Sequence, residues 1–83
     1  MEIIVRSAQQ LGTALRRHRS RRRLTQAEVA RSAGLGQPTV SEVEGGSPHS
    51  RLKTLEALLA ALELELVVRP RSSASPDDLA RIY

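Results

Sequence analysis

Apolar residues recur every three or four positions near the amino terminus, a spacing typical of a helix with one buried face. The inward stripe consists of Leu11, Ala14, Leu15 and a partly buried His18. The run Ser7-Ala8-Gln9-Gln10 has the S-x-x-Q form of a capping box. We therefore expect the first helix to begin after Ser7 and to end near Arg22, with Leu24 entering the core behind it.

Two shorter helices follow, joined by a tight turn. Thr25-Gln26-Ala27-Glu28 is a T-x-x-E capping box, and Gly34 stands where that helix can end in the left-handed conformation. The next helix begins near Gln37-Pro38, with proline in the first turn, where its missing N–H costs nothing, and ends at Glu44-Gly45-Gly46. We expect buried surface from Ala27, Val29, Ala30, Ala33, Leu35, Val40 and Val43. This layout is that of a helix-turn-helix, whose second helix can enter a DNA major groove.

A fourth helix is predicted after the loop from Ser47 to Ser50, with Ser50 as its cap. Its leucines recur at helical intervals and close the bundle: Leu52, Leu55, Leu58, Leu59 and Leu62.

The period then changes to two between Leu62 and Arg69, which indicates a β-strand that Pro70 ends. One face of this strand carries Leu64, Leu66 and Val68. A single strand cannot satisfy its own backbone, so we expect it to pair with the segment Ile3–Val5 or with the same strand of a second copy.

Composition limits the architecture to one small domain. The chain has 83 residues, no Phe or Trp, and one Tyr at position 83, so its core must be built from Leu, Val, Ile and Ala. We divide it into an arm or short strand at 1–6, a helical domain at 7–62, a dimerisation strand at 63–70 and a mobile tail at 71–83. A domain this small buries a modest share of its surface, so association of two copies would add stability.

Several kinds of chemistry are excluded by what the sequence lacks. Without cysteine there is neither a disulfide framework nor a thiolate, and the two histidines fall in different elements, so we expect no metal site. There is no nucleophile–base set and no Gly-rich cofactor loop, which predicts no enzyme activity and no cofactor. Neither a membrane-spanning run nor a signal-peptide layout is visible, so we expect a cytoplasmic protein.

The charge is basic and clustered. The chain has 13 Lys+Arg against 9 Asp+Glu, and six arginines fall within the eight residues from Arg16 to Arg23. Arginine binds phosphates bidentately, and this run directly precedes the helix-turn-helix, which favours a phosphate-contacting edge. The same run could instead be a solvated face or a nuclear localisation signal.

The region from Leu11 to Leu62 resembles the lambda-repressor-like (Cro/Xre) helix-turn-helix domains. The signature positions are filled by Gln26, Glu28, Ala30, Gly34, Leu35, Val40, Ser41, Val43, Glu44 and Gly46. With the strand added, the layout from Ile3 to Arg69 is similar to that of HipB-type antitoxins. The resemblance implies a mainly α fold of four or five helices, in which the C-terminal strand pairs across a dimer.

The same resemblance implies a function. Antitoxins of this type are homodimers that bind a palindromic operator in double-stranded DNA, repress their own operon, and restrain a HipA-like serine/threonine kinase toxin. Two alternatives stay open: a stand-alone Xre or phage-type repressor without a toxin, and a protein-interaction module that inhibits a partner enzyme.

Base contacts are expected from the exposed side of the recognition helix. Gln37 is the first candidate, because glutamine pairs bidentately with adenine. Thr39 and Ser41 could contact base or phosphate, and Glu42 could accept a hydrogen bond from cytosine. Gln37 could instead be a helix-capping or solvated glutamine, and Glu42 could merely soften the basic field. Pro38 stands where a small or polar residue is usual, so one direct contact is replaced by an apolar one.

Phosphate contacts are expected from Gln26, Thr25, Arg16, Arg19 and Arg23. Gln26 opens a helix whose positive end favours an anion. The resemblance implies that Arg19 forms an ion pair with Glu44, which holds the recognition helix at its angle. Arg23 replaces a usual glycine, so a positive φ there would strain it.

Two predictions concern association. Leu64, Leu66 and Val68 would form the dimer interface. Tyr83, the sole aromatic residue, could anchor a partner from the end of the tail, or could belong to a disordered terminus.

Overall fold

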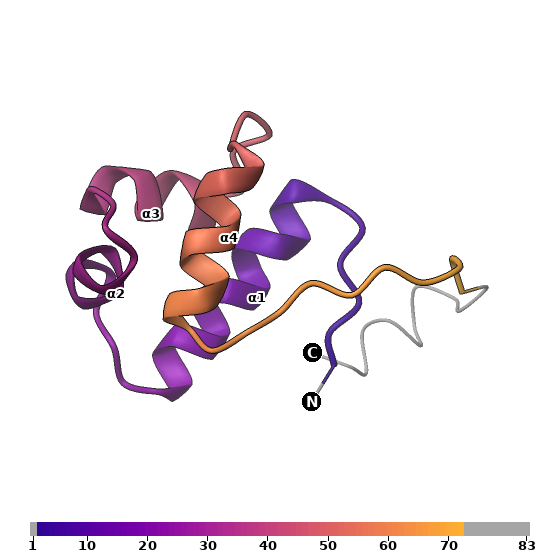
Figure 1. Ribbon diagram of the computed structural model, residues 1–83, viewed down its shortest axis with the longest axis horizontal. Helices are drawn as coiled ribbons and strands as arrows, with labels where there is room; N and C mark the ends of the chain where they lie inside the picture. The colour runs from indigo at the N-terminus through magenta and orange to yellow at the C-terminus, as the bar shows by residue number, and fades with distance from the viewer. Residues whose placement is uncertain (1, 73–83) are drawn as a thin grey trace.

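Four helices form the body of the molecule, as the computed structural model shows for residues 2–72, the part of the chain that it describes (Figure 1). In chain order they are α1 (Ala8–Arg21), α2 (Gln26–Ala33), α3 (Gln37–Glu44) and α4 (Leu52–Ala61). No residue from 2 to 72 is in a β-strand. The predictions for Tyr83 and for the rest of the tail from residue 73 onward lie outside the described residues.

α1 begins where its cap predicts. The Ser7 hydroxyl accepts a hydrogen bond from the Gln10 N–H at 3.0 Å. The returning half of the box differs from the expectation, because Gln10 Oε1 accepts from the Arg6 N–H, at 2.6 Å, and not from Ser7. The capping hydrogen bonds of α1 therefore reach Arg6, one residue before the N-cap Ser7.

The turn between α1 and α2 carries the strain that the sequence suggested. Arg23 has φ of +58°, in the left-handed region that favours glycine. Thr25 then forms both halves of its capping box with Glu28, each at 3.0 Å. At the far end of α2, Gly34 has φ of +69° and closes the helix as predicted.

α4 begins one residue later than expected and without a side-chain cap. Its N-cap is Arg51, so the prediction that Ser50 caps this helix is wrong. Glu63, just after the helix, has φ of +58°. It is a second left-handed residue besides Arg23, and the sequence did not predict it. The chain is thereby redirected into the segment 64–72.

The core is aliphatic. Its buried cluster contains Leu15, Val29, Ala30, Val40, Val43, Leu58, Leu59 and Leu62. Two expected members are exposed. Ala27 lies two residues before Val29, which places it on the opposite side of α2. Leu52 is 60% exposed in the first turn of α4.

α1 and α3 approach each other at Gly12. A Cβ atom at this position would lie 2.5 Å from the Val43 carbonyl oxygen and 2.7 Å from that of Glu44. Glycine is therefore required here by space and not by its backbone angles. Elsewhere α1 meets the end of α4, where His18 Nε2 lies 3.1 Å from the Leu62 carbonyl oxygen, and His18 is half-buried as predicted.

The amino-terminal arm and the segment 64–72 leave the helical body on the side away from α2 and α3 (Figure 1). Side chains join them: Arg69 Nη1 lies 3.2 Å from Glu2 Oε1, and Arg6 Nη2 donates to the Ser72 carbonyl at 2.8 Å. Neither segment is a strand in this single chain, although both were candidates. Neither segment has the regular pairing of a sheet, and two extended segments are too few to form a stable sheet without further strands.

Candidate nucleic-acid interface

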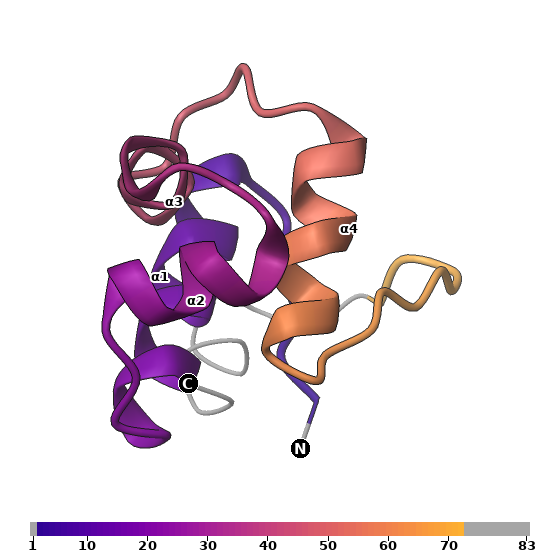
Figure 2. The same cartoon turned by 60° about the vertical axis from the view of Figure 1, so that its left-hand side comes forward.

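α3 presents one buried face and one open face. Val40 and Val43 are only 1% and 3% exposed and point into the core. Gln37, Ser41 and Glu42 are exposed, and Thr39 is half-buried. Figure 2 shows α3 at the edge of the helical body. This arrangement leaves the predicted base-contacting residues accessible to a groove.

Arg19 and Glu44 are in direct contact. Arg19 Nε donates to Glu44 Oε2 at 2.6 Å, and Arg19 Nη2 donates to Oε1 at 2.9 Å, which makes the pair bidentate. The two side chains are only 13% and 5% exposed. Arg19 Nη1 also donates to the Leu24 carbonyl at 2.7 Å. The guanidinium thus links α1, the turn after it and the end of α3.

Gln26 belongs to the same network. Its Nε2 donates to Glu44 Oε1 at 3.1 Å, which holds the amino end of α2 beside the carboxyl end of α3. One side-chain N–H of Gln26 is therefore already engaged. The phosphate contact expected from Gln26 would have to come from its backbone N–H or from the remaining side-chain N–H.

The charges of this network stabilise each other. Burial disfavours the Glu44 carboxylate, but hydrogen bonds from Arg19 and Gln26 and the charges of Arg19 and Arg16 outweigh it, so the pKa of Glu44 lies below its ordinary value. The hydrogen bond to Glu44 raises the pKa of Arg19, against the opposing effect of burial. Both groups stay ionised at neutral pH.

A basic edge lies next to this network. A hollow of about 480 Å³ is lined by Thr13, Arg16, Arg17, Ser20, Arg21 and Glu44. Arg16 is exposed on α1, and Arg23 and Thr25 are exposed in the turn that leads into α2. The structure therefore brings Arg16, Arg19 and Gln26 together around Glu44, while Arg23 and Thr25 sit in the adjoining turn.

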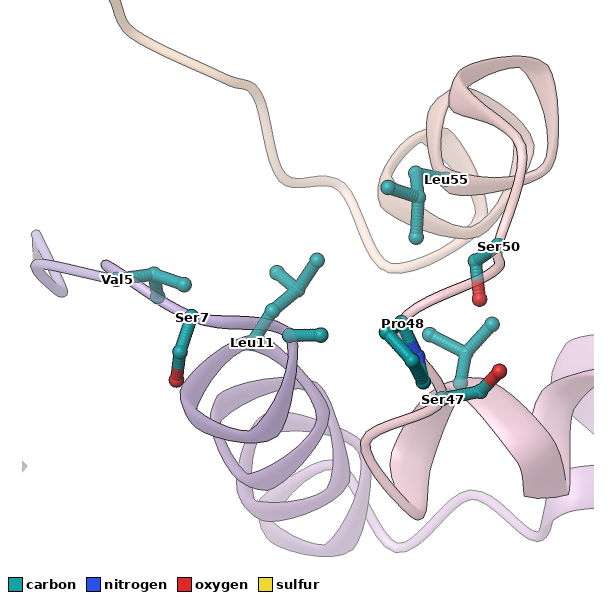
Figure 3. Close-up of a pocket in the computed structure, with 9 residues that line it drawn as sticks. Val5, Ser7, Leu11, Ser47, Pro48, Ser50 and Leu55 are labelled. Atoms are coloured by element: carbon teal, nitrogen blue, oxygen red, sulfur yellow. The ribbon is translucent and has the colours of Figure 1, made fainter.

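A second hollow is lined by apolar residues and serines and lies apart from the recognition helix's exposed face. It measures about 260 Å³ and lies between the arm, the start of α1 and the loop before α4, where Val5, Leu11, Pro48 and Leu55 line it (Figure 3). Its lining contains no ionisable side chain. Over residues 2–72 no three side chains gather as metal ligands, and no helix there has the length and apolarity needed to cross a bilayer.

Sequence reasoning missed two parts of this interface. Gly12 permits the close approach of α1 to α3, and a glycine inside a helical pattern was the signal for it. The contact of Arg19 with the Leu24 carbonyl had no signal in the sequence, because it depends on how the turn folds back over α1.

Comparisons with known proteins agree with this geometry. The family described as "Helix-turn-helix domain" matches residues 10–71. Antitoxin HipB of Escherichia coli (strain K12) is 32% identical over 71 residues, which are 86% of this chain and 81% of that protein. Antitoxin HipB of an Escherichia coli O6:H1 strain is also 32% identical over 71 residues, covering 86% of this chain and 76% of its own.

Solved structures of HipB have the same fold. A HipB-O4 20mer complex superposes with a TM-score of 0.81 at 28% identity, covering 86% of this chain and 100% of that one. A HipA-HipB-O2-O3 complex gives a TM-score of 0.80 at 28% identity with the same two coverages. The chain therefore belongs to the helix-turn-helix family and, within it, to the HipB antitoxins.

Proposed function

We propose that the chain is a homodimeric, operator-binding repressor and the antitoxin of a type II toxin–antitoxin pair. The observation that carries this proposal is the open polar face of α3, whose helix is tied to α1 and α2 through Glu44. A recognition helix that is held before binding loses less entropy when it enters a groove. No catalytic step is required, and a repressor of its own operon acts in the cytoplasm.

In this proposal the polar residues of α3 contact the base edges in the major groove. Gln37 would pair with adenine, while Thr39, Ser41 and Glu42 would complete the base-facing surface. The DNA backbone would be held by Arg16, Arg19, Arg23, Thr25 and Gln26. Phosphate contacts of this kind fix register, whereas base contacts give specificity.

The dimer would form through the segment 63–70. Leu66 and Val68 are 57% and 99% exposed in the single chain, and Leu64 packs on the core at the start of the segment. Exposed apolar residues on one face are suited to pairing with the same face of a second copy. Two helix-turn-helix units would then read half-sites about 34 Å apart, one turn of B-DNA.

The kinase partner is proposed from the relatives. HipB has been solved together with HipA, in a complex that this chain matches over 86% of its length. We therefore expect this chain to bind a HipA-like serine/threonine kinase and to restrain it.

The test is binding to duplex DNA from the region upstream of the chain's own gene, measured by fluorescence anisotropy at several salt concentrations. We expect log K to fall steeply with log salt, because phosphate contacts release counterions. Gln37→Ala should weaken specific binding by about 1–3 kcal/mol and leave binding to random DNA nearly unchanged. Gln9→Ala, which removes an exposed glutamine from α1, is the matched control.

Repeating the titration with and without a HipA-like kinase, together with a direct measurement of kinase binding, separates the alternatives. Specific DNA binding without affinity for any HipA-like kinase would identify a stand-alone repressor. Binding to a partner enzyme without a salt-dependent DNA complex would identify a protein-interaction module and would refute the proposal.

A further inference from the structure

We infer that Pro38 determines part of the operator sequence by packing its ring against the C5 methyl group of a thymine beside the base read by Gln37. This inference rests on the proposed DNA-binding function and adds a specificity-determining residue to it. It starts from an exposed apolar side chain at the most base-accessible point of α3.

Pro38 is exposed in the first turn of α3, directly after the exposed Gln37. The first residues of a recognition helix are the ones that reach base edges. A proline has no backbone N–H and no polar side-chain atom, so it cannot donate a hydrogen bond to a phosphate or to a base. Its ring can make only apolar contacts there.

The major groove offers one apolar group at a base edge. Of the four bases, only thymine presents a methyl group there; cytosine has a C–H at the same position, and the groups that otherwise distinguish the bases are hydrogen-bond donors or acceptors. An exposed proline ring at this place therefore matches thymine and no other unmodified base. A 5-methylcytosine carries the same methyl group, so the shared chemistry is a C5-methyl pyrimidine.

Gly36, the residue before Gln37 and Pro38, leaves the proline ring uncovered on one side. Gly36 is the N-cap of α3, and a Cβ atom at that position would lie 3.6 Å from Pro38 Cδ. Its backbone angles, φ −77° and ψ 148°, are extended and open to any residue, so the turn does not demand glycine. The missing side chain leaves this side of the ring accessible.

A purely structural role is the competing explanation, because proline suits the first turn of any helix. That role would affect folding, and the affinity for DNA would then not depend on a thymine methyl group. The discriminating measurement is therefore the dependence of affinity on that methyl group.

The experiment uses the full chain and a 20 bp duplex that the chain itself selects from a random pool. Each thymine is replaced in turn by deoxyuridine, which removes the methyl group and keeps the pairing edge. We expect one position in each half-site at which affinity falls about fourfold, equivalent to ~0.8 kcal/mol for one buried carbon. At that position 5-methylcytosine should bind more tightly than cytosine by a similar factor.

Variants assign the effect to the residue. In Pro38→Ser the deoxyuridine penalty should disappear at that position, whereas in Gln37→Ala it should persist although overall affinity falls. Far-UV circular dichroism checks that both variants fold, and the deoxyuridine and 5-methylcytosine series on the unaltered chain does not depend on them.

The outcomes for the two proposals differ. Specific binding that is insensitive to every thymine methyl, or a penalty retained in Pro38→Ser, overturns the role of Pro38 and leaves the repressor function standing. A chain that selects no sequence from the pool overturns both.

Discussion

Gln26 of α2 donates a hydrogen bond from Nε2 to Glu44 Oε1 of α3, at 3.1 Å. The same carboxylate accepts two hydrogen bonds from Arg19 of α1. One acidic side chain therefore fixes three helices relative to one another. The orientation of α3, on which base reading depends, is set inside the protein before any DNA arrives.

The Arg19–Glu44 pair is expected to be strongly coupled. Arg19→Ala or Glu44→Ala alone should lower the free energy of unfolding by about 3 kcal/mol, because each leaves a largely buried charge without its partner. The double variant should lose clearly less than the sum, giving a coupling above about 1 kcal/mol in urea denaturation followed by circular dichroism.

A second ion pair provides the control for that cycle. Arg22 Nη2 lies 3.8 Å from Glu63 Oε1, and both side chains are exposed, so its coupling should be near zero and at most about 1 kcal/mol. Equal couplings for the two pairs would contradict the view that burial sets the strength of the Arg19–Glu44 contact.

Stability should fall in acid. The pKa of Glu44 is lowered because hydrogen bonds from Arg19 and Gln26 outweigh burial, and the pKa of Glu28 is lowered chiefly by hydrogen bonds from Thr25. A carboxylate with a lowered pKa in the folded state stabilises the protein above its ordinary pKa of 4.5. This contribution is lost as the pH drops through the lower, folded-state value.

The measurement is the free energy of unfolding from about pH 6 down to about pH 3. In Glu44→Gln the unfolding free energy should be lower at pH 6, and its decline below the ordinary pKa should be shallower than in the unaltered chain. Parallel pH profiles for the two proteins would show that Glu44 does not titrate with folding.

Gly12→Ala should destabilise the protein although alanine is the better helix former. The new Cβ would stand 2.5 Å from the Val43 carbonyl oxygen, so α1 and α3 must separate. We expect a loss of about 1–3 kcal/mol, larger than the ~1 kcal/mol gained in helix propensity. Thr13→Ala, at the exposed neighbouring position, should be neutral or mildly stabilising in the same thermal unfolding experiment. A stabilised Gly12→Ala protein would refute the close approach.

The proposed dimer strand predicts a difference between adjacent residues. In a strand Val68 would share a face with Leu66 and Val67 would lie on the other face, and both valines are exposed in the single chain. Val68→Asp should shift the protein toward monomer and weaken operator binding, whereas Val67→Asp should do so less. Sedimentation equilibrium measures the association constant, and equal effects of the two substitutions would argue against a paired strand of this register.

Most of the helical framework could be predicted from local sequence signals. Thr25 with Glu28, Gly34 and Pro38 each act within one turn of chain, so their effects are readable without the fold. The left-handed Arg23 followed from its replacing a usual glycine in the family pattern. These features share one property, which is that the partner atoms are near in sequence.

What could not be predicted depends on distant partners. The exposure of Ala27 and Leu52 follows from which helix faces are covered. The segment 64–72 alternates like a strand yet has no regular pairing in one chain. The resemblance to known repressors supplied the Arg19–Glu44 pair, whereas the part of Gln26 in it emerged only from the packing.

The interior contains only aliphatic side chains, and the sole ring chromophore of the chain is Tyr83. The intrinsic fluorescence of the chain therefore comes from one residue, and residues 2–72 contribute none of their own. Any change in tyrosine emission or its quenching reports on the surroundings of Tyr83, so the unlabelled protein carries one optical probe at a known position.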